Sequence, residues 1–223
     1  MLVAGCPRCT SPVTEWQGTW ACDAHGPTAP LLRPQEVSYD AFADHLRRTP
    51  AFPTYLPWPL GPAWHVSDFA LVDSSRGGAG GAEGAAPGRA SASATMTCAS
   101  GVSALDGPVE VIVVAEEPGV GLGARCAGTT GPDPGDDVGG SRPDVRVRIG
   151  HQAVPLWTVS TSGADERFDR SVVAGEAYGR WLWIVLRPAS AILLLRDDWI
   201  LKDLSGVGPP LVELPFGGER PVW

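Results

Sequence analysis

Two pairs of metal-ligand side chains lie near the start of the chain. Two residues separate Cys6 from Cys9, two separate Cys22 from His25, and twelve residues lie between the pairs. A two-residue gap lets a short loop turn back so that both side chains face one ion, and three thiolates with one imidazole complete the tetrahedral shell that zinc prefers. The spacing predicts a zinc ribbon over residues 1–34. Because four protein ligands close the shell, we expect a structural Zn2+ ion.

The segment between the two pairs has the pattern of a short hairpin over residues 15–21. Trp16, Trp20 and Cys22 alternate along it, and we expect the two tryptophans to cap the metal site on one side. Gly26 follows the last ligand, where a residue with positive φ commonly closes such a loop. The ribbon is therefore expected to be a hairpin flanked by two chelating turns.

Charge and cysteine usage limit the partners and the compartment. The net charge of −8 and a pI near 4.9 oppose binding to a phosphate backbone, and the charges of residues 1–34 cancel, so we expect no nucleic-acid binding. Five cysteines without a secretory signal favour metal binding in the cytoplasm over disulfides. Charged residues interrupt the longest apolar run, 181–201, so no membrane span is expected.

Residues 35–63 are predicted to link the ribbon to the rest of the chain. Phe42, His45 and Leu46 recur at helical spacing within 38–48, and a short helix is expected there, with His45 as a structural residue. Prolines and aromatic residues then alternate over 49–64. This run is expected to be an extended connector that packs on the next domain, the alternative being a ligand for an aromatic-lined groove.

The remainder, 64–223, has the pattern of a β-rich domain. Apolar runs and period-two alternation separated by Gly and Pro predict eight strands, and Gly-rich stretches predict mobile insertions near 74–90 and 128–143. The fold class expected for the whole chain is α+β and mainly β, with one or two short helices. The strands are expected at 65–72, 91–98, 109–115, 145–149, 154–160, 181–186, 191–196 and 199–203.

A glycine-rich loop follows the predicted strand 109–115. Gly119, Gly121 and Ala124 formally satisfy the dinucleotide-binding fingerprint, in which backbone N–H groups and a helix N-terminus approach a pyrophosphate. Glu116 and Glu117 precede the loop, however, and would repel a phosphate. We therefore expect a structural turn followed by a short helix.

Glu176 and Arg180 lie on either side of a glycine turn, before a very apolar strand. One interpretation is an ion pair between them. The other makes Glu176 and Arg180 the rim of a small-ligand pocket, in which the guanidinium receives an anion through a bidentate fork. The sequence alone does not distinguish the ion pair from the pocket rim.

Several short motifs are distributed along the chain: Cys6-Pro-Arg-Cys9, Trp20-Ala-Cys22-Asp-Ala-His25, Leu56-Pro-Trp-Pro-Leu60, Glu116-Glu-Pro-Gly-Val-Gly-Leu-Gly-Ala124, Gly175-Glu-Ala177 and Gly179-Arg-Trp-Leu-Trp183. Together they resemble an actinobacterial family of unknown function that carries an N-terminal zinc ribbon. Some members of that family bear a phosphotransacetylase label, so the resemblance implies an acyl- or phosphoryl-transfer enzyme that uses loop 119–123 and Arg180.

The residues themselves favour a different function. No Ser-His-Asp or paired-carboxylate pattern stands out, and the predicted metal site is closed. We therefore expect a non-enzymatic binding or regulatory module that recognises a protein partner or a small ligand, with the transfer enzyme as the alternative.

Overall fold

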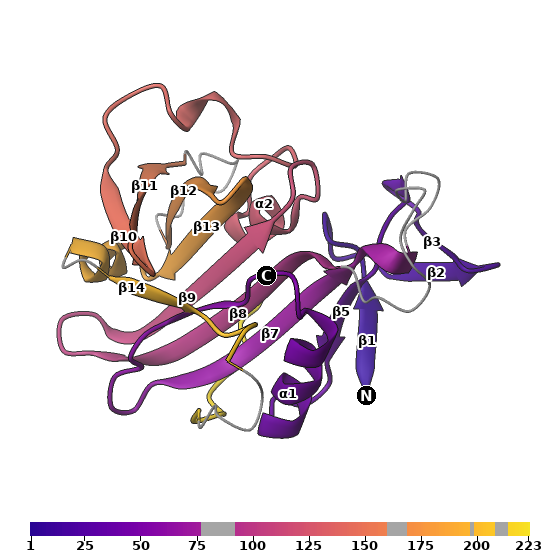
Figure 1. Ribbon diagram of the computed structural model, residues 1–223, viewed down its shortest axis with the longest axis horizontal. Coiled ribbons are helices and arrows are strands. Elements are labelled where there is room, and N and C mark those ends of the chain that lie inside the picture. The colour runs from indigo at the N-terminus through magenta and orange to yellow at the C-terminus, as the bar shows by residue number, and fades with distance from the viewer. Residues whose placement is uncertain (77–91, 160–168, 197–198, 208–213) are drawn as a thin grey trace.

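The computed structural model of the protein describes residues 1–76, 92–159, 169–196, 199–207 and 214–223. Strands dominate it, with a large sheet and a small Cys-rich sheet near the N-terminus (Figure 1), so the expected mainly β fold class is confirmed. The insertion predicted near 74–90 falls almost wholly outside the described residues. The stretch 128–143 is mostly bends and irregular segments around the 3-10 helix η2 (Gly135–Asp137), and its mobility stays a prediction.

Within the described residues, eleven strands form the large sheet, and neighbours run antiparallel except for one parallel pair, β10 and β14. In sheet order they are β1 (Leu2–Gly5), β5 (Leu31–Pro34), β7 (His65–Asp73), β8 (Ala92–Ser103), β9 (Gly107–Glu116), β13 (Arg180–Arg187), β12 (Ser171–Ala177), β11 (Gln152–Thr158), β10 (Val145–Ile149), β14 (Ile200–Asp203) and β6 (Tyr55–Pro57).

The small sheet interrupts the chain between two strands of the large one. It comprises β2 (Val13–Trp16), β3 (Thr19–Cys22) and β4 (Gly26–Pro27). Before and after it, β1 and β5 pair with each other, and β5 pairs with β7. Both ends of the Cys-rich segment are therefore strands of the large sheet. The boundary predicted at residue 34 stays a prediction.

The central strands β9 and β13 are buried on both faces, which explains their continuous apolar sequences. Val113 pairs with Ile184, and both side chains belong to the core enclosed by β6, β10, β11 and β14. Their neighbours Val114 and Trp183 also pair, but face the opposite core, where α2 (Leu122–Ala127) packs. The sheet thus carries a hydrophobic core on each side of its centre.

The sheet curls so that its last strand, β6, comes back against β8. The hydroxyl of Thr97 on β8 donates to the carbonyl oxygen of Tyr55 at 2.6 Å, and the Thr95 hydroxyl donates to that of Pro53. The Pro-rich stretch, expected to be an extended connector, therefore contributes an edge strand, which pairs with β14.

Helix α1 (Tyr39–Arg48) confirms the helix expected over 38–48. The Ser38 side chain accepts a hydrogen bond from the Ala41 N–H and caps the helix, and Phe42 packs on Phe69 of β7. His45 is buried, its Nε2 lies 3.2 Å from the Thr54 hydroxyl, and burial lowers its pKa to about 3. It is a structural histidine, as expected.

The strand expected at 191–196 is wrong, because this segment lies in the 3-10 helix η3 (Ala189–Arg196). Ala191 and Leu195 are buried whereas Leu193, midway between them, is exposed, so the burial does not follow the period of two that a strand requires. A further 3-10 turn, η1, covers Ser74–Arg76. In the described ranges no helix has both the length and the apolar character needed to cross a membrane.

Candidate metal centre

The metal-ligand side chains lie at the two turns that flank the β2–β3 hairpin. Cys6 and Cys9 belong to the turn between β1 and β2, where the Cys6 N–H donates to the Ser11 carbonyl at 3.3 Å. Cys22 ends β3, and the His25 N–H donates back to its carbonyl. Gly26 has φ +68°, which confirms the positive φ expected after the last ligand.

The four ligand atoms converge on one point. All of them lie within 4.8 Å of one another. The Cys6 Sγ and His25 Nδ1 are 3.6 Å apart, the Sγ atoms of Cys9 and Cys22 are 3.6 Å apart, and Cys22 Sγ lies 3.7 Å from His25 Nδ1. Tetrahedral zinc with Zn–S bonds of about 2.3 Å places sulfur atoms about 3.8 Å apart. Cys6, Cys9, Cys22 and His25 therefore lie close enough to bind a metal ion.

The pKa values of two of the thiols move in opposite directions. Burial raises the pKa of the Cys6 thiol to about 11. Burial also acts to raise the pKa of Cys9, but hydrogen bonds from Ser11 and from the neighbouring thiols lower it to about 6. Cys9 therefore supplies a thiolate at neutral pH, and the remaining thiol protons leave when a metal ion binds.

Trp16 does not cap this site, so that part of the expectation is wrong. It is 76% exposed and stands opposite Thr19, whereas Cys22 stands opposite Val13. Residues that oppose each other share a face and neighbours along a strand alternate, so Trp16 lies on the face away from Cys22. The two-residue turn sets this register, with Gln17 at φ +50°.

Two arginines join the metal-ligand turn to the glycine-rich loop and to α2. Arg8 lies between the first two cysteines, and its Nε donates to the Val120 carbonyl at 3.2 Å while an Nη donates to that of Gly119. Arg125 of α2 donates from Nη1 to the Cys6 carbonyl. The candidate metal centre is therefore docked on the loop that follows β9.

In the glycine-rich loop, the Glu116 carboxylate lies where a nucleotide-binding loop would hold a phosphate. Glu116 is fully buried, and its Oε2 accepts hydrogen bonds from the N–H groups of Leu122 at 2.7 Å and Gly123 at 3.2 Å, the first residues of α2. Burial raises the pKa of Glu116 to about 7 against these two hydrogen bonds, which lower it. An internal group thus occupies the donors that a nucleotide-binding loop offers to phosphate.

The glycines of this loop serve close packing. A Cβ on Gly123 would lie 2.2 Å from the Trp183 ring, and one on Gly121, whose φ is +87°, would lie 3.0 Å from the Arg8 side chain. The Gly119 N–H donates to the Asp133 carboxylate at 2.8 Å. This geometry supports the interpretation of loop 119–123 as a structural turn.

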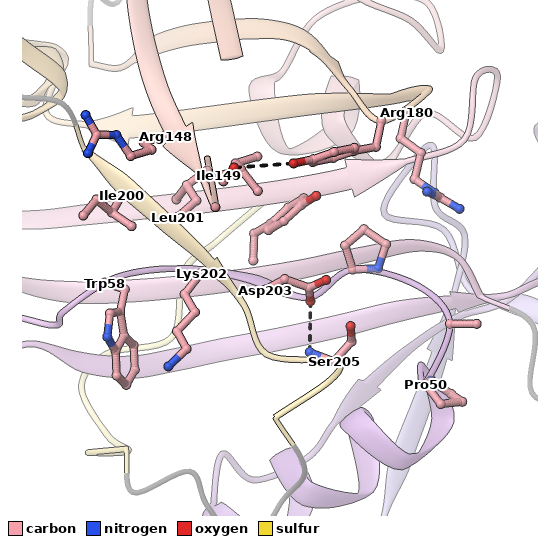
Figure 2. Close-up of a pocket in the computed structure, with 15 residues that line it drawn as sticks. Pro50, Trp58, Arg148, Ile149, Arg180, Ile200, Leu201, Lys202, Asp203 and Ser205 are labelled. Atoms are coloured by element: carbon pink, nitrogen blue, oxygen red, sulfur yellow. Dashed lines mark hydrogen bonds between the residues drawn. The ribbon is translucent and has the colours of Figure 1, made fainter. Parts of the chain in front are cut away.

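Arg180 lies at a groove of the structure, whereas Glu176 lies outside it. The guanidinium of Arg180 pairs with Glu117 at 3.1 Å and stacks on Phe52, 4.6 Å from the ring centre, whereas Glu176 is exposed on β12. Arg180 lines a groove of about 980 Å³, and Glu176 is not among its lining residues (Figure 2). The structure thus associates Arg180 with a cavity but not Glu176.

The sequence does not indicate a buried carboxylate on β7, which Trp223 and Arg125 connect indirectly to the metal-ligand turn. Asp68 of β7 is fully buried and pairs with Arg33 at 2.6 Å and with Arg220 at 2.7 Å, and the Trp223 indole donates to it at 3.3 Å. Trp223 in turn stacks with Arg125. Asp68 lies within the apolar stretch 65–72, and nothing in its sequence surroundings indicates partners more than 150 residues away.

A protein-family model described as "Family of unknown function (DUF6758)" matches residues 2–222, nearly the whole chain. No match was found among the curated proteins or among the solved structures.

Proposed function

The chain belongs to this family of unknown function (DUF6758), and we propose that it is a non-enzymatic binding protein whose Cys/His cluster holds one structural zinc ion. The observation that carries the proposal is the convergence of three thiols and one imidazole, all within 4.8 Å of one another. Soft sulfur ligands with one nitrogen in a tetrahedral arrangement are typical of zinc, and four protein ligands leave no position for a reacting water.

The zinc ion would tie the turn at Cys22 and His25 to the β1–β2 turn, from which the Arg8 side chain and the Cys6 carbonyl contact the rest of the molecule. Its role is to hold the β2–β3 hairpin in one position against loop 119–123 and α2. Metal binding of this kind contributes folding free energy locally, since the turns have little apolar surface of their own. The five cysteines are all free thiols, which suits a reducing compartment such as the cytoplasm.

The alternative, an acyl- or phosphoryl-transfer enzyme, receives less support. Its phosphate site would need the backbone donors of loop 119–123, and the carboxylates of Glu116 and Asp133 accept from three of them. A second anion would have to displace these internal carboxylates.

Metal analysis of the full chain tests the proposal. The expected result is one equivalent of zinc per chain, lost in the double variant Cys6→Ser with Cys22→Ser. Cys98→Ser is the matched control, because Cys98 is a free thiol buried elsewhere, on β8. Zinc below about half an equivalent, or equal zinc content in the double variant and in the control, would overturn the proposal.

A further inference from the structure

We propose that the groove between β6, β14, the end of β10 and the β12–β13 turn binds an acidic peptide segment of a partner protein, anchored by Lys202 and Arg180. The inference rests on the proposed function, since it names the ligand class of a binding protein. Three features of the groove support it: its positive charge, the residue types that line it and the unpaired edge of β14.

The groove has the opposite charge to the chain as a whole. Its lining contains three cationic side chains and one carboxylate, Asp203, whereas the chain carries a net charge of −8. In Figure 2, Lys202 and Trp58 lie at one end, Arg180 lies at the other, and Asp203 lies between them. A ligand with separated negative charges therefore matches the two ends.

The ammonium group of Lys202 is positioned so that it can bind an anion. Its ammonium nitrogen lies 4.4 Å from the centre of the Trp58 ring, and β14 pairs Lys202 with Leu56 of β6, which fixes the backbone on which the side chain stands. In the part of the chain that the structure describes, no carboxylate pairs with Lys202. It is also the only lysine of the sequence.

Arg180 is oriented from two sides. Phe52 supports the plane of its guanidinium, and Glu117 accepts the Nε–H at 3.1 Å. Among the described residues, no hydrogen bond of the two terminal amino groups competes with a ligand. A guanidinium presents five N–H donors in a fixed fork, so these groups can receive a ligand carboxylate in bidentate fashion. Arg148 also lines the groove, but it has an interaction of its own, and the proposal does not depend on it.

Between the two cations, the groove offers partners for a main chain. Tyr55 lines the groove, and its hydroxyl is protonated at neutral pH, so it can donate a hydrogen bond. Asp203 also lines the groove, and its Oδ1 accepts the N–H groups of Thr54 at 3.0 Å and Ser205 at 2.9 Å.

The edge of β14 is open at this place. β14 pairs with β10 only at Ile200 and Leu201, whereas its pairing with β6 continues to Asp203. Past Leu201, its β10-facing edge therefore has no strand partner within the described ranges. An extended peptide can add to such an edge through main-chain hydrogen bonds, while its side chains reach the flanking cations.

The lining favours a peptide over a small enclosed ligand or a nucleic acid. The groove is open, since Pro50, Gly150, Tyr178 and Asp203 are exposed, and Trp, Tyr and Arg are the residues that dominate binding energy at protein interfaces. A nucleic-acid strand would bring a phosphate at every residue, and the carboxylates of Asp203 and Glu117 oppose such a continuous negative charge.

The test uses the zinc-loaded full chain and a fluorescein-labelled ten-residue peptide of alternating Glu and Ala. Fluorescence anisotropy at low salt is expected to give a Kd below about 100 μM. Amide chemical shifts of residues 149–150, 178–180 and 201–205 are expected to move on binding. Lys202→Gln with Arg180→Gln should weaken binding by about 10-fold or more, and Lys202→Gln alone by about 3-fold.

The matched control is Arg142→Gln with Arg146→Gln, which removes the same charge from exposed arginines outside the groove. Equal weakening in this control, shifts confined to other residues, or tighter binding of a ten-nucleotide single strand would overturn the proposal. So would equal binding of a Lys-Ala peptide, or displacement by millimolar inorganic phosphate. Zinc content is measured on the same sample. A chain that contains zinc but does not bind the peptide therefore contradicts this inference and leaves the proposed zinc site standing.

Discussion

The side chain of Arg8 donates a hydrogen bond to the carbonyl oxygen of Gly119, 111 residues further along the chain. Arg8 lies in the turn that carries Cys6 and Cys9, and its own N–H donates to the Cys6 Sγ at 3.4 Å. Gly119 lies in the loop after β9 that also receives the Asp133 carboxylate. One residue therefore couples the candidate metal centre to the loop that leads into α2.

Replacing this arginine should loosen the contact without emptying the metal site. Arg8→Met removes two side-chain hydrogen bonds to carbonyl groups, and we expect a loss of about 1 kcal/mol in the free energy of unfolding, with faster amide exchange in loop 119–121. Metal content should stay unchanged, because the ligand atoms remain. Urea denaturation and hydrogen exchange check this, with Arg142→Met as the exposed control. Unchanged exchange in the loop would show that the contact carries no coupling.

Gly123→Ala should destabilise the protein through overpacking. The new Cβ would lie 2.2 Å from the Trp183 ring, which is fully buried and cannot move without disturbing the core. The expected loss is about 1–3 kcal/mol in urea denaturation. Gly206→Ala is the control, because no atom lies within 4 Å of its added Cβ. Equal stability of the two variants would contradict the packing of α2 described above.

Glu116 should make the free energy of unfolding fall as the pH rises from about 4.5 to 7. Its pKa is near 4.5 in the unfolded chain and about 7 in the native state, so the native state binds more protons between these values. The unfolding free energy therefore decreases from about pH 4.5 to 7, by on the order of 3 kcal/mol. Glu116→Gln should lack this decrease, since its amide does not titrate.

The comparison between the chain and Glu116→Gln isolates this effect. His45, whose pKa burial lowers to about 3, acts in the opposite direction below its unfolded value of 6.5, and acid also protonates the metal ligands. Both contributions are common to the two proteins and cancel in their difference. Urea denaturation at pH 5 and at pH 8 measures that difference, and a value independent of pH would refute the assignment.

The closed glycine loop predicts no binding of acetyl phosphate, coenzyme A or ATP. Glu116 and Asp133 accept the loop's N–H groups, so a phosphate would meet negative charge in place of free donors. Calorimetry and an acetyl-transfer assay check this expectation. A Kd below about 100 μM that Gly121→Val abolishes would favour the transfer enzyme instead.

The metal ligands and much of the sheet could be predicted from local patterns. The spacing of Cys6, Cys9, Cys22 and His25 and the capped helix α1 depend on residues close in sequence. Strand β10 was expected at 145–149 and lies at Val145–Ile149, because an alternating run between turns determines it locally.

Long-range relationships were not predictable in this way. Asp68 pairs with Arg33 and Arg220, and these residues lie close together only in the folded chain, where β5, β7 and the C-terminal segment are neighbours. The segment around Ala191 and Leu195 is short and apolar, a pattern that predicts a strand but does not distinguish it from a buried helical turn. The groove is formed by segments from residue 50 to residue 205, so its charge appears in no local motif.

Zinc K-edge X-ray absorption of the purified full chain tests the central claim most directly. The structure has three cysteine sulfurs and the Nδ1 of His25 around one point. The account predicts a four-coordinate shell of three sulfurs at about 2.3 Å and one nitrogen at about 2.0 Å. A shell dominated by oxygen, or one containing fewer than three sulfurs, would contradict it.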